Sequence, residues 1–169
     1  MRLPAIFLAG VTALLAGCAG YHLGPANGGS AREKSIEVLP FNNQTLQPRL
    51  GDAVTQALRE RLQVDVTYHL ATQGDADVVV TGVITRYHRQ GLSYLSKDAT
   101  TTQNYRVDIV AHVIARERAT GKALLDKNVT AYTLVNVGAD LASSERQATP
   151  QLAEDLARNI AELLTDGAW

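Results

Sequence analysis

Cysteine is almost absent from this chain of 169 residues, which contains one, Cys18. A single cysteine excludes a disulfide within the chain, so the folded part must draw its stability from an apolar core. Long apolar runs are also scarce. The one that stands out, residues 3–15, is too short to cross a bilayer, which takes roughly 20 apolar residues.

An excess of positive charge is missing as well, because 16 Lys and Arg stand against 17 Asp and Glu, for a formal net charge of −1. This balance argues against nucleic acid as a partner. The sequence has neither a Gly-x-Ser-x-Gly elbow nor a phosphate-binding loop. We therefore expect no enzymatic activity and no cofactor.

Metal-ligand spacing is absent too. The histidines lie far apart in sequence, and we interpret them as solvated strand residues rather than as zinc ligands. Two nearby carboxylates, Asp75 and Asp77, are expected to flank a turn and cap a strand edge. The four histidines are His22, His69, His88 and His112.

The surroundings of Cys18 are typical of a bacterial lipoprotein signal peptide. Arg2 supplies an early positive charge, residues 3–15 are the apolar segment, and the run Leu15-Ala16-Gly17-Cys18 closes it. This pattern predicts cleavage before Cys18 and attachment of lipid to its sulfur. The alternative is an ordinary secretory signal, cut near Ala19 or Gly20, in which the cysteine is incidental.

The lipoprotein interpretation divides the chain into a cleaved signal at residues 1–17, a lipidated tether at 18–31 and a single domain at 32–169. The tether is rich in Gly, Asn, Pro and Ala, a composition typical of flexible linkers. Ala19 follows the cysteine where Asp would favour retention in the inner membrane. We therefore expect an anchor in the outer membrane, with the domain on its periplasmic side.

The hydrophobic pattern of the domain predicts five strands and two helices. A helix beginning near Pro48 presents one apolar face, and a second presents a leucine-rich face after beginning at Ser144 or, with Thr149 as cap, at Pro150, and it ends before Gly167. The polar residues 89–102 are either a long loop or the frayed ends of two strands that project beyond the sheet. Strands are expected over residues 35–41, 64–71, 78–87, 105–116 and 123–135, the last two joined by a hairpin turn.

The predicted order is β-α-β-β-β-β-α. It favours an α+β two-layer sandwich with two helices packed on one face of a mostly antiparallel four- to five-stranded sheet. The opposite sheet face is then the natural binding surface. Basic residues gather on its strands and loops and suit anionic headgroups. The alternative is a solvated face whose charges prevent aggregation. These residues are Arg86, Arg89, Lys97, Arg106, Arg116, Arg118, Lys122 and Lys127.

Six short pieces of the chain match the pattern of a known family in order and spacing. They are residues 18–23, 36–45, 76–84, 105–107, 121–122 and 152–157. In these pieces the chain resembles the LPS-assembly lipoproteins called LptE. The start Cys-Ala-Gly-Tyr is one residue longer than the family's Cys-Gly-Tyr.

The resemblance implies an α+β domain that sits as a plug inside the outer-membrane β-barrel LptD and helps to place lipopolysaccharide in the outer leaflet. It also implies binding of lipopolysaccharide by basic residues, for which the positions in this chain are Arg86, Arg89, Lys97 and Arg106. The competing hypotheses are a lipoprotein activator of a periplasmic peptidoglycan synthase and an enzyme of unknown type. A tether of about a dozen residues spans at most roughly 40 Å, which favours a partner in the same membrane.

Overall fold

The computed structural model describes residues 34–64, 68–71, 74–95, 98–137 and 140–165, all within one compact unit, residues 33–169. Within these ranges, side chains are described for all residues except 94–101. The helices among the described residues are α2 (Leu50–Val64) and α3 (Leu141–Thr165). The strands are β1 (Lys34–Val38), β2 (Asn42–Asn43), β3 (Tyr68–Leu70), β4 (Val78–Leu95), β5 (Asp98–Glu117) and β6 (Ala123–Asn136).

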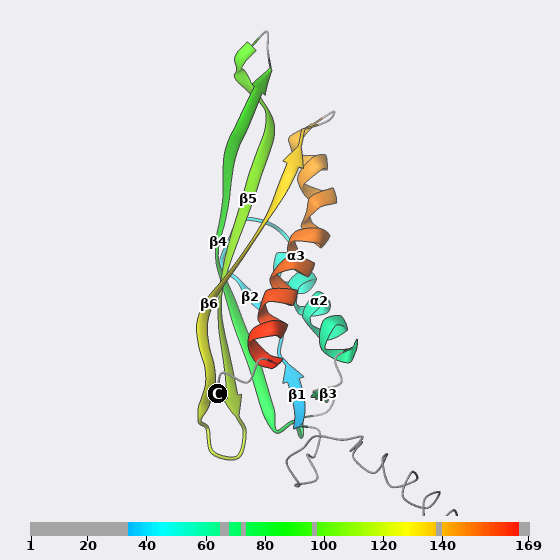
Figure 1. Ribbon diagram of the computed structural model, residues 1–169, viewed down its shortest axis with the longest axis vertical. Helices are drawn as coiled ribbons and strands as arrows, with labels where there is room; N and C mark the ends of the chain where they lie inside the picture. Colours follow the sequence, from blue (N-terminus) through cyan, green and yellow to red (C-terminus); the bar gives the residue numbers. More distant parts are fainter. Residues whose placement is uncertain (1–33, 65–67, 72–73, 96–97, 138–139, 166–169) are drawn as a thin grey trace, which may run out of the picture. The chain divides into compact units, whose positions relative to one another are not determined.

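The strands form one six-stranded sheet in the order β3-β1-β4-β5-β6, with the short β2 also paired to β4. Strands β4, β5 and β6 are long, pair antiparallel and make up most of the sheet (Figure 1). The short strands β1, β2 and β3 pair parallel. The predicted fold class and element order are confirmed, and β2 is the one added strand.

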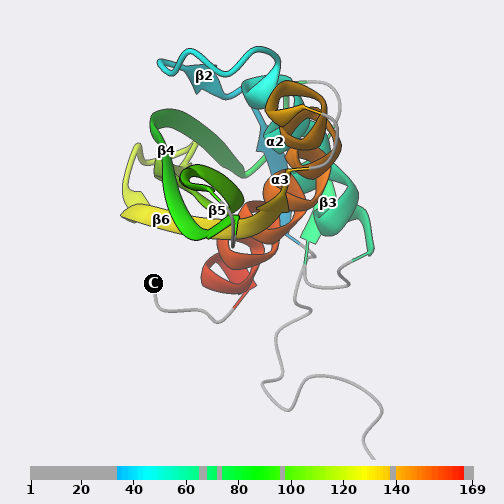
Figure 2. The same cartoon turned by 90° about the horizontal axis from the view of Figure 1, so that it is seen from above.

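Both helices lie on the same side of the sheet, so that one sheet face is covered and the other is not (Figure 2). The covered face supplies alternate residues of β5, which are buried because every second side chain of a strand points to the same face. Each helix packs its own apolar face against this side of the sheet. Together they form one core that includes Ile36, Leu58, Leu62, Ile84, Ile109, Val113, Leu156, Ile160 and Leu164.

Phe41 fixes the connection between β1 and α2. Its ring packs against Gly82 of β4, where a Cβ atom would lie 2.0 Å from the ring, and its carbonyl oxygen would lie 2.5 Å from a Cβ at Gly51. Its N–H donates to the hydroxyl of Thr55, at 2.9 Å. Gly82 therefore leaves the space that the Phe41 ring occupies.

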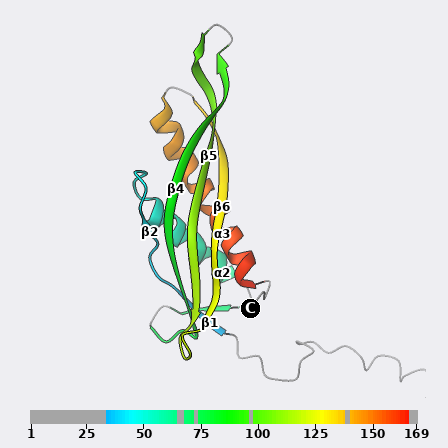
Figure 3. The same ribbon diagram turned by 90° about the vertical axis from the view of Figure 1, so that its left-hand side faces the viewer.

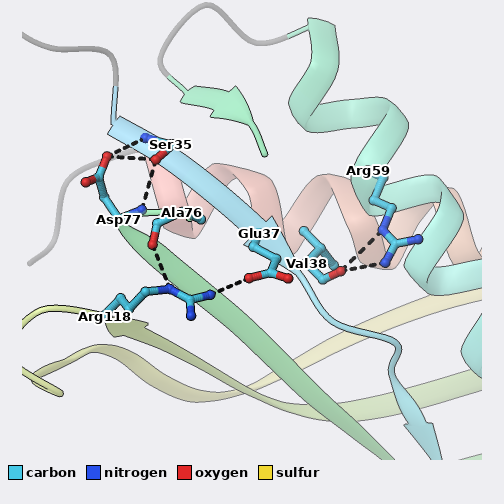
Figure 4. Close-up of polar contacts among 7 residues, drawn as sticks. All are labelled: Ser35, Glu37, Val38, Arg59, Ala76, Asp77 and Arg118. Carbon is cyan, nitrogen blue, oxygen red and sulfur yellow. Dashed lines mark hydrogen bonds and ion pairs between the residues drawn. The ribbon is translucent and has the colours of Figure 1, made fainter. Parts of the chain in front are cut away.

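Polar contacts hold β1 where the chain enters the domain (Figure 4). Asp77 accepts hydrogen bonds from the N–H and the hydroxyl of Ser35, at 2.9 and 2.8 Å. Arg118, in the turn between β5 and β6, donates to the carbonyl oxygen of Ala76 at 3.0 Å and to the carboxylate of Glu37 at 2.5 Å. Asp77 therefore caps a strand edge, as its position in the sequence predicts.

Several predicted bounds differ from the structure. The first strand ends at Val38 rather than at residue 41, and Val64 belongs to α2 rather than to the next strand. Residues 89–95 and 98–102 continue β4 and β5 as paired strands, which decides between the two alternatives in favour of projecting strands. Gly167, the predicted helix stop, lies outside the described residues.

The start of α3 is also earlier than either prediction. Asp140 is the N-cap, because its carboxylate accepts the N–H of Ser143 at 2.7 Å. That hydrogen bond, more than any other contact, lowers the pKa of Asp140. Pro150 lies inside the helix, where it cannot donate a main-chain hydrogen bond.

Candidate functional site

The uncovered face of β4, β5 and β6, called the outer face below, is the candidate site. It is open to view in Figure 3, with the helices behind the sheet. Apolar side chains lie among charged and polar ones across it, so it differs from a plain solvated surface. By strand register its members include Val83, Arg86 and His88 of β4, Arg106, Asp108, Val110, His112 and Ile114 of β5, and Asp126, Thr130, Tyr132 and Leu134 of β6.

A β-bulge at Thr85 decides which residues of β4 reach this face. Ile84 pairs with Ala111, whereas Arg86 pairs with Val110, so one residue of β4 has no counterpart in β5. Above the bulge, even-numbered β4 residues therefore share the outer face with Val110. Odd-numbered residues turn toward the helices. Arg86 and Arg89, both predicted to bind the same ligand, lie on opposite faces.

Arg106 is held within the outer face. Its guanidinium lies 4.0 Å from the centre of the Tyr132 ring, in a cation–π contact. Its Nε also donates to the carboxylate of Asp108 at 2.8 Å. Arg106 is therefore engaged by two neighbours before any ligand arrives.

Arg86 is the more available cation. It lines a shallow depression of the outer face together with His88, Asp108 and Thr130. Within the described part of the chain, its side chain makes no hydrogen bond or ion pair. Arg86 is thus placed to meet an anionic group at no cost of breaking an internal contact.

Arg89 lies on the covered face and belongs to a different cluster. Its Nε lies 3.3 Å from Oε1 of Glu145, a residue of α3 that is only 8% exposed. Burial first, and then the charge of Glu145 and a hydrogen bond to it, raise the pKa of Tyr87 to about 12. This cluster fastens the first turns of α3 to β4. The role of Arg89 in ligand binding stays a prediction.

The four predicted cations therefore do not form one cluster. Arg86 and Arg106 share the outer face, Arg89 faces α3, and Lys97 lies outside the described residues, as does Cys18. Sequence reasoning missed Tyr132 and Leu134, two residues that are 55% and 64% exposed. Their even spacing in the strand, in phase with Thr130, was the available signal.

Within the described part of the chain, no group of three or more His, Cys, Asp or Glu is arranged to hold a metal ion. His112 instead contacts a single carboxylate, Asp126, at 2.8 Å. Neither described helix combines the length and the apolar character needed to cross a membrane.

Solved structures with a similar fold come from several bacteria. Protein CT253 of Chlamydia trachomatis matches with a TM-score of 0.58 and 12% identity, covering 79% of this chain and 97% of that one. Protein XCC0632 of Xanthomonas campestris matches with a TM-score of 0.55 and 9% identity, covering 79% and 85%. At these identities the likeness establishes the fold alone. No curated protein matches the sequence.

The family model described as LptE, Lipopolysaccharide-assembly, matches residues 33–164. The match spans every described strand and both helices to within one residue of the end of α3. It agrees with the resemblance carried by the short sequence pieces. The chain therefore belongs to the LptE family of lipopolysaccharide-assembly proteins.

Proposed function

We propose that this chain is an outer-membrane lipoprotein subunit of the lipopolysaccharide translocon, anchored through Cys18 on the periplasmic side. In this role it plugs the LptD β-barrel, assists its assembly and helps to place lipopolysaccharide in the outer leaflet, without enzymatic activity. The observation that carries the proposal is the family match over residues 33–164, in a fold whose described helices both lie on one face of the sheet and leave the outer face to a partner.

The outer face supports contact with both a protein and an anionic lipid. Its half-buried Val83, Val110 and Ile114 offer apolar area, which gains free energy when a partner removes it from water. Arg86 adds a cation that has no partner among the described residues and suits a phosphate or carboxylate group. A mixed surface of this kind fits a subunit that contacts a barrel lumen and a charged lipid.

Co-purification tests the proposal. The full-length lipoprotein, tagged at its C-terminus, is expected to bring LptD with it in mild detergent, and its depletion is expected to leave lipopolysaccharide in the periplasm. A photo-crosslinker at Tyr94 should capture the barrel. Capture of a peptidoglycan synthase instead, without LptD, would establish the activator hypothesis in its place.

A further inference from the structure

The free edge of β6 is a second surface, distinct from the outer face. β6 is the last strand of the sheet, next to β5. The N–H of Val137 donates to the carbonyl oxygen of Gln103 at 2.9 Å, so odd-numbered positions here direct their main-chain groups toward β5. Main-chain groups alternate along a strand. Those of Tyr132 and Leu134 therefore point away from the sheet.

Helix α3 covers only part of this edge. The amide of Asn159 donates to the carbonyl oxygen of Thr130 at 2.8 Å, which both confirms the alternation and places α3 beside β6 at that level. Toward its start, α3 lies over β4 instead, where Glu145 meets Arg89. Figure 3 shows this diagonal course behind the sheet. Among the residues that the structure describes, none outside β6 is hydrogen-bonded to the outward main-chain groups of Tyr132 or Leu134.

The open edge lacks the residues that usually prevent an edge strand from pairing with another chain. Natural edge strands avoid unwanted pairing through charged residues, Pro or bulges. The lower part of β6 carries Asp126 and Lys127, but residues 129–137 contain no charge and no Pro. Over half of the Tyr132 and Leu134 side chains is exposed. The open stretch of residues 131–136 is roughly 20 Å long, enough for a short strand.

We propose that residues 131–136 of β6 form a strand-addition site for an extended segment of the partner barrel protein. The inference rests on the proposed function for the identity of that partner. Main-chain hydrogen bonds supply the affinity in this mode of recognition. A closed barrel wall has no free edge of its own, so the segment comes from a part of the partner outside the wall.

The groove next to the edge favours a basic residue in the incoming segment. It is lined by Thr130, Tyr132, Arg158 and Asn159 and continues past Glu162. Arg158 is already paired with Asp155. Within the described residues Glu162 has no ion pair, so a basic residue in the incoming segment would complement it.

Two variants of Leu134 separate main-chain pairing from side-chain contact. Leu134→Pro removes the outward N–H and Leu134→Ala keeps it, while both remove the exposed side chain. We expect Leu134→Pro to reduce capture of LptD in mild detergent about tenfold relative to Leu134→Ala. Because this N–H makes no bond to β5, proline at an edge position should leave the sheet intact. Urea unfolding of both variants checks that.

A second measurement keeps the proposal open to contradiction if the proline variant unfolds. Hydrogen exchange of the wild-type protein should show the amides of Tyr132 and Leu134 exchanging fast when free and at least tenfold slower in complex with LptD. Equal capture by two folded variants, or unchanged exchange in the complex, overturns the proposal. A homodimer lost on Leu134→Pro, with LptD capture intact, assigns the edge to a second copy and overturns it too. Failure of the wild type to bind LptD counts instead against the proposed function, and this inference falls with it.

Discussion

At the scale of single residues, the contacts that each cation already makes decide how readily it can bind an anionic ligand. Arg86 and Arg106 both lie on the outer face, yet Arg106 is engaged by Tyr132 and Asp108 while Arg86 lines an open depression. A guanidinium with no internal partner can give all its donors to a ligand. One already paired must exchange one contact for another.

This difference predicts unequal effects of matched substitutions. Arg86→Gln should weaken lipopolysaccharide binding about tenfold, since a charge-assisted hydrogen bond contributes roughly 1.5–3 kcal/mol. Arg106→Gln should weaken it less than threefold. Both are measurable by binding of fluorescent lipopolysaccharide to the purified domain. A larger loss for Arg106→Gln than for Arg86→Gln would contradict this ranking.

Tyr87 predicts a pH dependence of stability at alkaline pH. Its pKa is raised in the folded protein to about 12, from 10.0. The folded state therefore keeps a proton that the unfolded state loses, and the associated stability is complete below pH 10 and lost as the pH rises through 12. Urea midpoints between pH 9 and 12 should fall less steeply for Tyr87→Phe than for the wild type. Parallel slopes for the two proteins would count against a raised pKa.

At the scale of elements, one hydroxyl joins the strand-to-helix connection to the helix itself. Thr55 is buried, accepts the N–H of Phe41 at 2.9 Å and donates to the carbonyl oxygen of Gly51 at 2.7 Å. This explains why the chain after β1 can turn into α2 without a buried N–H left unpaired.

Replacing that hydroxyl by a methyl group should destabilise the domain. Thr55→Val preserves the shape of the side chain but leaves the Phe41 N–H buried without an acceptor, at a cost of about 1–3 kcal/mol. Thr55→Ser keeps the hydroxyl and serves as the control. Urea unfolding of the two variants measures the difference, and equal free energies of unfolding would show that the hydrogen bond contributes nothing.

Long, regular elements were predictable from the sequence. In β5, the alternation of Val107, Ile109, Ala111 and Val113 with polar or half-buried residues is a direct result of covering one sheet face and not the other. The apolar faces of both helices were predictable for the same reason, since each covers part of that sheet. The fold class follows from these elements alone.

Local irregularities were not predictable. The bulge at Thr85 uses a residue that is ordinary in strands, so nothing in the sequence marks the reversal that separates Arg86 from Arg89. The start of α3 was missed because Pro150 suits a first helical position, whereas Asp140 caps the helix much earlier. The candidate site was therefore predicted as a face, but not residue by residue.

At the scale of the whole molecule, the core and the proposed anchor are separable. The core residues all lie between Ile36 and Leu164, far along the chain from Cys18. Cys18→Ala, with a signal that is still cleaved, should therefore shift the melting temperature of the domain by less than about 2 °C. It should lower the amount of assembled LptD several-fold, because the anchor concentrates the two proteins at one membrane.

Thermal unfolding and blotting of folded LptD check the two halves of that prediction. A collapse of the melting temperature on loss of the lipid would mean that the anchor contributes to the fold. Unchanged levels of folded LptD would mean that the domain binds its partner without the lipid anchor.

Strands β4 and β5 continue past the last residue of β6, so their far ends form a two-stranded ribbon. The chain enters the domain at Lys34, whose strand pairs with the opposite end of β4. β4 has 18 residues, which is roughly 60 Å of extended chain. The length of β4 thus sets the distance between the entry point and the far end of the ribbon. Because side chains alternate with a period of two, one residue inserted within β4 would turn every later side chain of that strand to the opposite sheet face, unless a second bulge restored the phase.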